Sequence, residues 1–411
     1  MNLTTASGAS RNIPLQDLVG LLRVEADHRL DVIVGSGALR AEGARLVLDG
    51  TEPQLGPAGV TMTAGNYTVN DVALGQLADK LAIPGAYLRR LHEVHPDLFD
   101  ANVNGWLART DRRFLVRAHR TPTPGTGLDA LPDYGFPPAP QIAAPQLPPP
   151  AAGDGTVRAV LSDRYSRIDN LDVLIAALAG IRDSGAAVDV DGCDLTDRRM
   201  YVRVVAPGVR VQAPALLANY RSPFTGQAGR DLPIVWAGFV LSNSEVGAGA
   251  FTLRPRLVAQ VCRNGMVMPV DGMRRTHLGA RHDGDDGVVT WSQETTARTL
   301  DLITSRTKDV VAAYLDGDYV ARMVRDLETV AGTPVRDPDT TLKVIGQRLR
   351  FTESQQSDVL AHFIAGADLT AGGVMHAVTS LAQTITDADA AHELEAVAVQ
   401  AMHLAAAAST R

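Results

Sequence analysis

The stretch AAVDVDGCDLTDRRMYVRVVAP, residues 186–207, indicates the fold more clearly than any other part of the chain. It contains two arms around a polar centre, as a β-hairpin does. In the second arm, a period of two residues places Tyr201 and Arg203 on one face and Val202 and Val204 on the other. The stretch therefore predicts two antiparallel strands whose sheet carries an arginine on one face.

Segments on either side of this hairpin predict the rest of a β-rich core. Before it, TVRAVL (156–161) predicts a strand, and NLDVLIAALAGIR (170–182) predicts an amphipathic helix with Asn170 as its N-cap. After it, residues 232–245 predict another strand, and residues 249–270 are apolar and rich in β-forming residues.

Helical patterns flank this core at both ends. Residues 68–92 predict helices, the first capped by Thr68 or Asn70. From about residue 290 the chain becomes helical, and TESQ (352–355) matches a capping box. The predicted fold class is α+β, with a mixed, largely antiparallel β core, flanking helices and a helical C-terminal third.

Length and composition limit the classes of protein to consider. A chain of 411 residues predicts two or three domains, and 45% hydrophobic with 21% charged residues excludes a mostly disordered chain. We expect no transmembrane helix, because no run of about 18 apolar residues occurs, and no secretory signal. Two cysteines, Cys193 and Cys262, exclude a disulfide scaffold and fit a cytoplasmic location.

Residues 121–155 break the pattern of strands and helices. They are dense in proline, glycine and alanine, and therefore predict an extended linker or loop. The expected division of the chain is an N-terminal α+β module at 1–120, the Pro-rich linker or loop at 121–155, a β-rich core at 156–290 and a helical C-terminal region at 291–411.

The net charge of −7 is distributed unevenly along the chain. Residues 1–282 carry a net charge of +2, whereas residues 283–411 carry −9. Of the 39 basic residues, 36 are arginine, whose planar guanidinium suits phosphates and stacking. The acidic total therefore does not exclude a polyanionic partner for the N-terminal two-thirds.

Two runs of arginine are candidates for contact with phosphates. The run at 251–282 opposes one acid, Asp271, with six arginines: Arg254, Arg256, Arg263, Arg274, Arg275 and Arg281. If several of them share a face, they would bind nucleic acid in a salt-dependent way. The alternative is ion pairing with the acidic C-terminal region, or a solvated surface. A second run at 109–120 is more typical of an exposed strand edge.

The turn SDRYSR (162–167) contributes further candidate residues. Arg164, Tyr165 and Arg167 are residue types that stack on bases or grip a strand. The alternative for this turn is a purely structural role. The complete predicted nucleic-acid site consists of Arg164, Tyr165, Arg167, Arg203, Arg254, Arg256, Arg263, Arg274 and Arg275.

The signals for catalysis are weaker. Ser244 and Glu245 could pair as nucleophile and base, but no GxSxG elbow surrounds them. Cys262 stands beside Arg263, which lowers a thiol pKa where the two are close. We predict no catalytic residue, no metal site and no cofactor, and keep an enzyme with a site near Ser244, Glu245 and Cys262 as an alternative.

Several stretches in combination resemble a phage- and plasmid-borne family known as domain of unknown function 932. The most specific are the Ser-Asp-Arg-Tyr turn at 162–165 and the Asn-Ser-Glu to Cys-Arg-Asn-Gly block at 243–265. The resembling stretches are 66–90, 101–107, 159–174, 238–268 and 372–385, so that the resemblance covers most of residues 60–400. It implies a mobile-element origin and a cytoplasmic setting, and it implies no settled activity.

The order of elements in the core is analogous to that of single-strand annealing proteins, which carry a small antiparallel sheet against a helix. We therefore expect a phage- or plasmid-type accessory protein that binds or anneals single-stranded nucleic acid, with no membrane partner and with self-association into a homo-oligomer. A third reading is a host-interaction or structural protein that uses the acidic C-terminal region.

Overall fold

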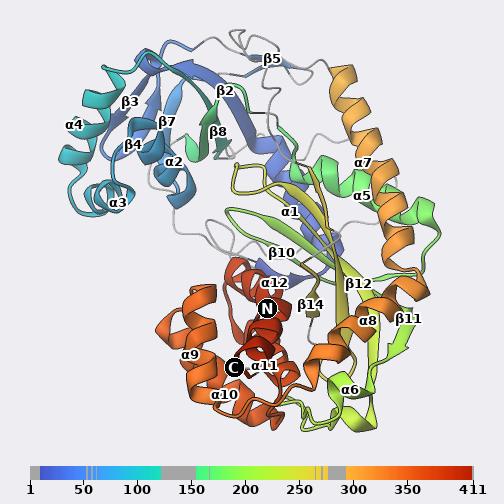
Figure 1. Ribbon diagram of the computed structural model, residues 1–411. Helices are drawn as coiled ribbons and strands as arrows, with labels where there is room; N and C mark the ends of the chain where they lie inside the picture. Colours follow the sequence, from blue (N-terminus) through green and yellow to red (C-terminus); the bar gives the residue numbers. More distant parts are fainter. Residues whose placement is uncertain are drawn as a thin grey trace, which may run out of the picture.

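The chain has the α+β fold that the sequence predicts (Figure 1). The computed structural model describes residues 10–51, 54–56, 59–61, 63–121, 154–165, 167–263, 265–269, 272–275 and 293–409. Within these residues, two large β-sheets of seven and six strands, here called sheet A and sheet B, are surrounded by helices. A separate two-stranded sheet consists of β5 (Gln54–Gly56) and β6 (Gly59–Thr61).

Sheet A contains the hairpin on which the fold prediction rests. Its strands are antiparallel and follow the order β1-β10-β11-β12-β13-β14, with β15 also paired to β13. They are β1 (Ser10–Ile13), β10 (Asp189–Leu195), β11 (Met200–Gln212), β12 (Ile234–Asn243), β13 (Phe251–Ala259), β14 (Gly265–Val267) and β15 (Met273–Arg275). The predicted alternation is confirmed: Val202 and Val204 lie in an apolar core, and Tyr201 and Arg203 lie on the opposite face.

Sheet B has the order β2-β8-β9-β7-β4-β3, and only the β7–β9 pair is parallel. Its strands are β2 (Arg29–Gly35), β3 (Leu39–Glu42), β4 (Arg45–Leu48), β7 (Gly65–Val69), β8 (Arg113–Arg120) and β9 (Gly155–Ser162). Three helices pack on one face of it, around buried residues such as Leu74, Leu88 and Phe99. These are α2 (Asp71–Leu81), α3 (Gly85–Val94) and α4 (Pro96–Leu107).

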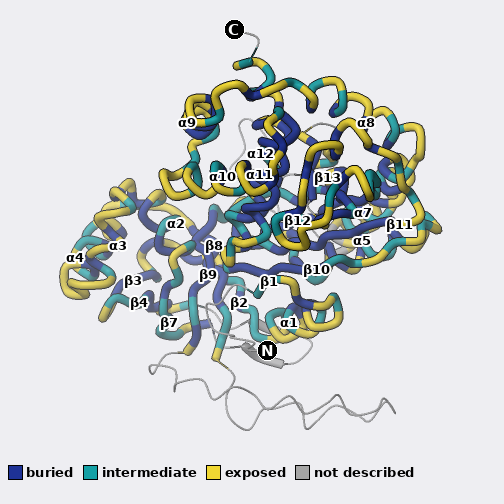
Figure 2. The backbone as a smooth tube through the Cα atoms, turned by 90° about the horizontal axis from the view of Figure 1, so that it is seen from below, coloured by how far each residue is buried: buried dark blue, intermediate teal, exposed yellow. Residues whose placement is uncertain are grey.

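The other helices cover sheet A and form the C-terminal region. They are α1 (Leu15–His28), α5 (Asn170–Ser184), α6 (Pro214–Leu217), α7 (Gln293–Tyr314), α8 (Gly317–Ala331), α9 (Pro338–Leu349), α10 (Glu353–Gly366), α11 (Ala371–Thr384) and α12 (Ala388–Ser409). Helices α1, α5 and α7 pack on the apolar face of the hairpin. Helix α11 is buried from Ala371 to Ala382, with exposed segments of its neighbours around it (Figure 2). None of the described helices combines the length and the apolar character needed to cross a bilayer.

The predicted N-cap residues are confirmed for two of the three helices. The Asn70 side chain accepts a hydrogen bond from Ala73 N at the start of α2, and Thr352 with Gln355 forms the capping box of α10. Asn170, by contrast, is the first residue of α5 rather than its cap. Its backbone N–H donates to Glu245 Oε2 at 3.1 Å, so a distant carboxylate satisfies this helix end.

The Pro-rich stretch does not separate the two sheets. Thr121 N donates to Asp154 O at 2.9 Å, and β8 pairs with β9 from Phe114 to Arg120. Residues 122–153, which lie outside the described residues, therefore connect adjacent strands of sheet B. The expected domain division differs from the sheet boundaries for two reasons: β9 belongs to sheet B rather than to the later core, and β1 belongs to sheet A.

Candidate functional site

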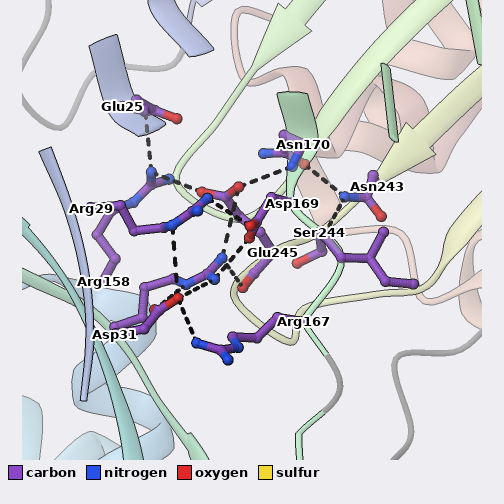
Figure 3. A network of polar contacts seen from close by, with 12 residues as sticks. Glu25, Arg29, Asp31, Arg158, Arg167, Asp169, Asn170, Asn243, Ser244 and Glu245 are labelled. Carbon is purple, nitrogen blue, oxygen red and sulfur yellow. Dashed lines mark hydrogen bonds and ion pairs between the residues drawn. The ribbon is translucent and has the colours of Figure 1, made fainter. Parts of the chain in front are cut away.

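A network of buried charges lies where sheet B meets the β12–β13 loop of sheet A (Figure 3). Arg117, on β8, has a side chain with 0% exposure. Its Nε and Nη2 atoms donate to the two carboxylate oxygens of Asp31, each at 2.8 Å, and Nη2 also donates to Asp169 Oδ1 at 2.8 Å. Its third nitrogen, Nη1, donates to the backbone oxygen of Glu245 at 3.0 Å. All the nitrogens of this guanidinium are therefore engaged.

Other arginines form ion pairs with Glu25, Glu245 and Asp169. Arg158, on β9, lies between Glu25 and Glu245, with Nη1 at 3.1 Å and 3.5 Å from their oxygens. Arg29 contacts Asp169 at 2.7 Å. The network contains four arginines and four acids, and is thus balanced in charge: Arg29, Arg117, Arg158, Arg167, Glu25, Asp31, Asp169 and Glu245. Buried ion pairs of this kind join elements specifically, and each depends on all of its partners.

Burial and pairing shift the pKa values of these groups in opposite directions. Burial raises the pKa of Asp31, but the hydrogen bonds and charge of Arg117 outweigh it, so the pKa falls below its usual value. Burial raises the pKa of Glu25, and the single contact with Arg158 does not reverse this shift. Burial opposes the charge of Arg117, but its carboxylate partners raise its pKa overall. Both shifts favour the charged forms of Arg117 and Asp31, so this ion pair is ionised at neutral pH.

His119, two residues beyond Arg117, remains uncharged next to this network. Burial, followed by the charges of Arg158 and Arg117, lowers the pKa of His119 to about 3. Arg158 Nη1 lies 3.4 Å from His119 Nε2, a contact that requires the neutral ring to accept. Because the unfolded chain binds the proton at about pH 6.5, the contribution of His119 to stability is complete above that pH and is lost toward pH 3.

We expect His119→Gln to make the free energy of unfolding depend less on pH below pH 6.5. The wild-type chain should lose about 2 kcal/mol more than the variant between pH 6.5 and pH 5, at about 1.4 kcal/mol per pH unit. Urea denaturation of both proteins across this range measures the difference. Parallel profiles would show that the ring of His119 titrates normally in the folded protein.

The residues of the predicted alternative enzyme are not brought together. The buried Ser244 side chain accepts a hydrogen bond from Ala248 N at 2.9 Å, as in a turn. Glu245 belongs to the charge network, and Cys262 is a buried cysteine beyond the far end of β13. The length of β13 separates Ser244 from Cys262, so the structure supplies no shared site for them.

A second buried network lies on the polar face of sheet A and includes Arg203. With 5% exposure, Arg203 is buried, and its Nη1 donates to Asp194 Oδ2. His392 Nε2, on α12, lies 2.8 Å from the same oxygen, and the His392 ring stacks on Tyr201 with centroids 3.8 Å apart. Asp194 Oδ1 also accepts from Asn12 N, on β1, at 2.7 Å. This network attaches β1 and α12 to the sheet.

Arg256, another predicted phosphate ligand, is likewise an internal ion-pair residue. It is 3% exposed, and its Nη atoms lie 3.4 Å from Asp191 and 3.4 Å from Glu395. The alternative of pairing with the acidic C-terminal region therefore applies to this arginine. Neither Arg203 nor Arg256 presents a guanidinium to an external ligand, and the expectation that they line an arginine surface is wrong for both.

Five of the predicted arginines are exposed: Arg167, which contacts Asp31, and four others. Arg254 and Arg274 lie on β13 and β15, Arg263 follows β13, and Arg164 lies in the turn after β9. None of these four has an acidic side chain within 4.0 Å among the described residues. Arg275 occupies a register position opposite Phe251, and its side chain lies outside the described part.

The turn at 162–167 is held against the β12–β13 loop rather than standing free. Tyr165 is half-buried, its hydroxyl donates to Ser244 O at 3.3 Å, and burial raises its pKa. Arg167 is 44% exposed in its side chain and lies 3.3 Å from Asp31. Of the three predicted turn residues, Arg164 is the one with an exposed charge and no ion pair to a described residue.

Sequence reasoning missed the acids that surround Arg117. One local signal was present: FLVRA (114–118) and TVRAV (156–160) each set a single arginine among apolar strand residues, which is typical of a buried ion pair. No local pattern identified Asp31, Asp169 or Glu245 as its partners. His392 was missed because it stands in an alanine-rich helix.

The comparisons with known proteins add no identification. No family model matches this chain, and it matches neither a curated protein nor a solved structure. The resemblance to the phage and plasmid family therefore stays a prediction that rests on the motifs alone.

Proposed function

We propose that this protein binds single-stranded nucleic acid through exposed arginines on the polar face of sheet A, as a phage- or plasmid-type accessory protein. The observation that carries the proposal is the position of Arg254 and Arg274 on neighbouring strands, β13 and β15. Both are exposed, both lack an acidic partner within the described residues, and both lie on one face of the sheet. Two adjacent uncompensated guanidiniums attract phosphates.

The register of the strands supports this arrangement. Thr252 pairs with Arg274 and with Ser242, and Arg254 lies two residues along from Thr252 on the same face. Arg254 Cγ lies 3.2 Å from the position that a Cβ on Gly272 would occupy, so β15 runs close beside it. The Ser242 and Thr252 hydroxyls lie 2.7 Å apart between the strands. Guanidinium and hydroxyl groups together are typical contacts to a nucleic-acid backbone.

Further polar and basic residues next to Arg254 and Arg274 could contact a longer nucleic-acid strand. The β12–β13 loop begins just beyond Ser242, and Arg199 Nε donates to Ala248 O in this loop at 3.0 Å. The Tyr165 hydroxyl donates to Ser244 O at the start of the same loop, and the exposed Arg164 is its neighbour in the chain. We name the surface formed by Arg164, Arg199, Ser242, Thr252, Arg254 and Arg274 the arginine patch.

We expect the double variant Arg254→Ala/Arg274→Ala to bind an oligothymidine about 100-fold more weakly than the wild type, at about 1.4 kcal/mol for each arginine. The salt dependence should also decrease, by about 0.7 in the slope of log K against log salt for each lost phosphate contact. Fluorescence anisotropy of a labelled strand between 20 and 200 mM salt measures both quantities.

The matched control is Arg348→Ala, since Arg348 is an exposed arginine of α9, away from the patch. It should bind as the wild type does. Equal loss in the control and in the double variant would mean that only net charge matters. Absence of binding at 20 mM salt, or binding that is indifferent to salt, would overturn the proposal.

A further inference from the structure

The end of β12 opposite the arginine patch adjoins a cleft of about 480 Å³. Its walls come from the segment after α6 and from the connection between α10 and α11. The lining residues are Ala218, Asn219, Tyr220, Arg221, Ala228, Arg230, Ala367, Leu369 and Thr370. The volume falls in the range of small-molecule sites. The ten residues of β12 place this cleft about 30 Å from the patch.

The floor of the cleft is fixed by a buried acid behind it. The buried Asp368 accepts a hydrogen bond from Thr370 Oγ1 at 2.7 Å, and burial raises its pKa although hydrogen bonds from Thr370 and Asn219 lower it. Tyr220 stacks on the fully buried His376, with ring centroids 4.3 Å apart. Asn219, Tyr220 and Thr370 are thereby held in place without a ligand.

The charge available in the cleft is positive. Arg221 and Arg230 are both exposed at its rim, and no acid is among its lining residues. Arg221 Nη1 donates to Gly226 O at 2.6 Å, which orients this side chain and leaves its other N–H groups available. Arg230 has a loose contact of 3.8 Å with the exposed Asp231. An anion between the two guanidiniums would replace this contact with a stronger one.

We propose that this cleft binds a small phosphate-bearing molecule, with its phosphate between Arg221 and Arg230 and its apolar part against Ala218, Ala367 and Leu369. Two forked guanidiniums match the several oxygens of a phosphate. The small alanine side chains leave room for a ring or an alkyl group. The site is independent of the arginine patch, because it shares no residue with it.

Isothermal titration of the full chain with inorganic phosphate, adenosine monophosphate and adenosine tests the proposal. We expect saturable binding of at least one phosphate-bearing probe and weaker or no binding of adenosine. Arg221→Ala and Arg230→Ala should each weaken binding about tenfold or more, equivalent to about 1.4 kcal/mol. Since Arg230 is exposed and, among the described residues, its ion pair is the loose contact with Asp231, Arg230→Ala tests the site even if Arg221→Ala perturbs the loop. Arg348→Ala, on the surface of α9, should bind as the wild type.

The outcomes separate the alternatives. Binding of the nucleotide without binding of inorganic phosphate supports the site and shows that the apolar walls contribute. Adenosine binding as tightly as its monophosphate would overturn the proposal, because the arginines would then not recognise the ligand. Absence of saturable binding for every probe, or binding that Arg230→Ala leaves unchanged, would overturn it as well.

Discussion

Replacing Arg117 by methionine is expected to lower the free energy of unfolding by about 3–5 kcal/mol, a large part of the stability of a typical protein. Methionine fills a similar length of space, so the loss comes from charge rather than volume. Asp31, Asp169 and the backbone oxygen of Glu245 would lose their shared donor in a site without water contact at Arg117. Uncompensated buried carboxylates either take up protons or draw water into the junction between the sheets. Urea denaturation monitored by circular dichroism measures the loss.

The matched control is Arg167→Ala, because Arg167 contacts the same Asp31 from a position that is 44% exposed. Its loss should cost less than about 1 kcal/mol. Adding Asp31→Asn to Arg117→Met should recover part of the stability, since it removes the excess negative charge that the loss of Arg117 leaves in the network. If Arg117→Met were as mild as the control, the buried network would contribute nothing specific to the fold.

Local patterns predicted several elements of this fold, but not β1 or the strand β7, whose last residues were predicted as helical. The alternation through Tyr201 and Arg203 predicted the face of each residue, and capping residues such as Asn70 and Thr352 predicted helix starts. These signals work because they depend on neighbours within a few residues. The assignment of β9 failed for the opposite reason. The local sequence of a strand does not indicate which sheet the strand joins. A proline-rich stretch also resembles a domain boundary, although here the strands on either side of it, β8 and β9, pair with each other.

The candidate site was only partly predictable because the state of an arginine depends on distant partners. Arg203, Arg254 and Arg256 look alike in the sequence. Arg203 pairs with the buried Asp194, and Arg256 pairs with Glu395 on α12. Arg254 is exposed, and no acidic side chain of the described residues lies within 4.0 Å of it. The count of arginines thus indicated a basic surface but could not separate ligand-binding residues from structural ones. The cleft beside Arg221 left no local signal, since its walls lie about 150 residues apart.

Replacing Asp194 by alanine is expected to have an effect of similar size, again about 3–5 kcal/mol. Asp194 is 0% exposed and receives hydrogen bonds from β1, β11 and α12, through Asn12, Arg203 and His392. Its removal leaves the Arg203 guanidinium buried without its acid. We expect β1 and α12 to loosen first, because Asp194 is their shared attachment to the sheet. Hydrogen exchange measured by mass spectrometry should show faster exchange in Ser10–Ile13 and in the first turns of α12.

The pH dependence of the same residue provides an independent test. Burial raises the pKa of Asp194, but His392, Arg203 and Asn12 N together lower it to about 2. A depressed carboxyl pKa means that its stabilisation is complete above about pH 4 and is lost as the pH falls toward 2. Asp194→Asn should therefore be destabilised at pH 7 and show a smaller further loss between pH 4 and pH 2 than the wild type. Asp191→Asn is the control, since Asp191 also pairs with a buried arginine but is 20% exposed and 3.4 Å away, so it should cost about 1 kcal/mol or less. Equal losses for Asp191→Asn and Asp194→Asn, without a change in exchange at β1, would contradict the role of Asp194 as the attachment of the two chain ends.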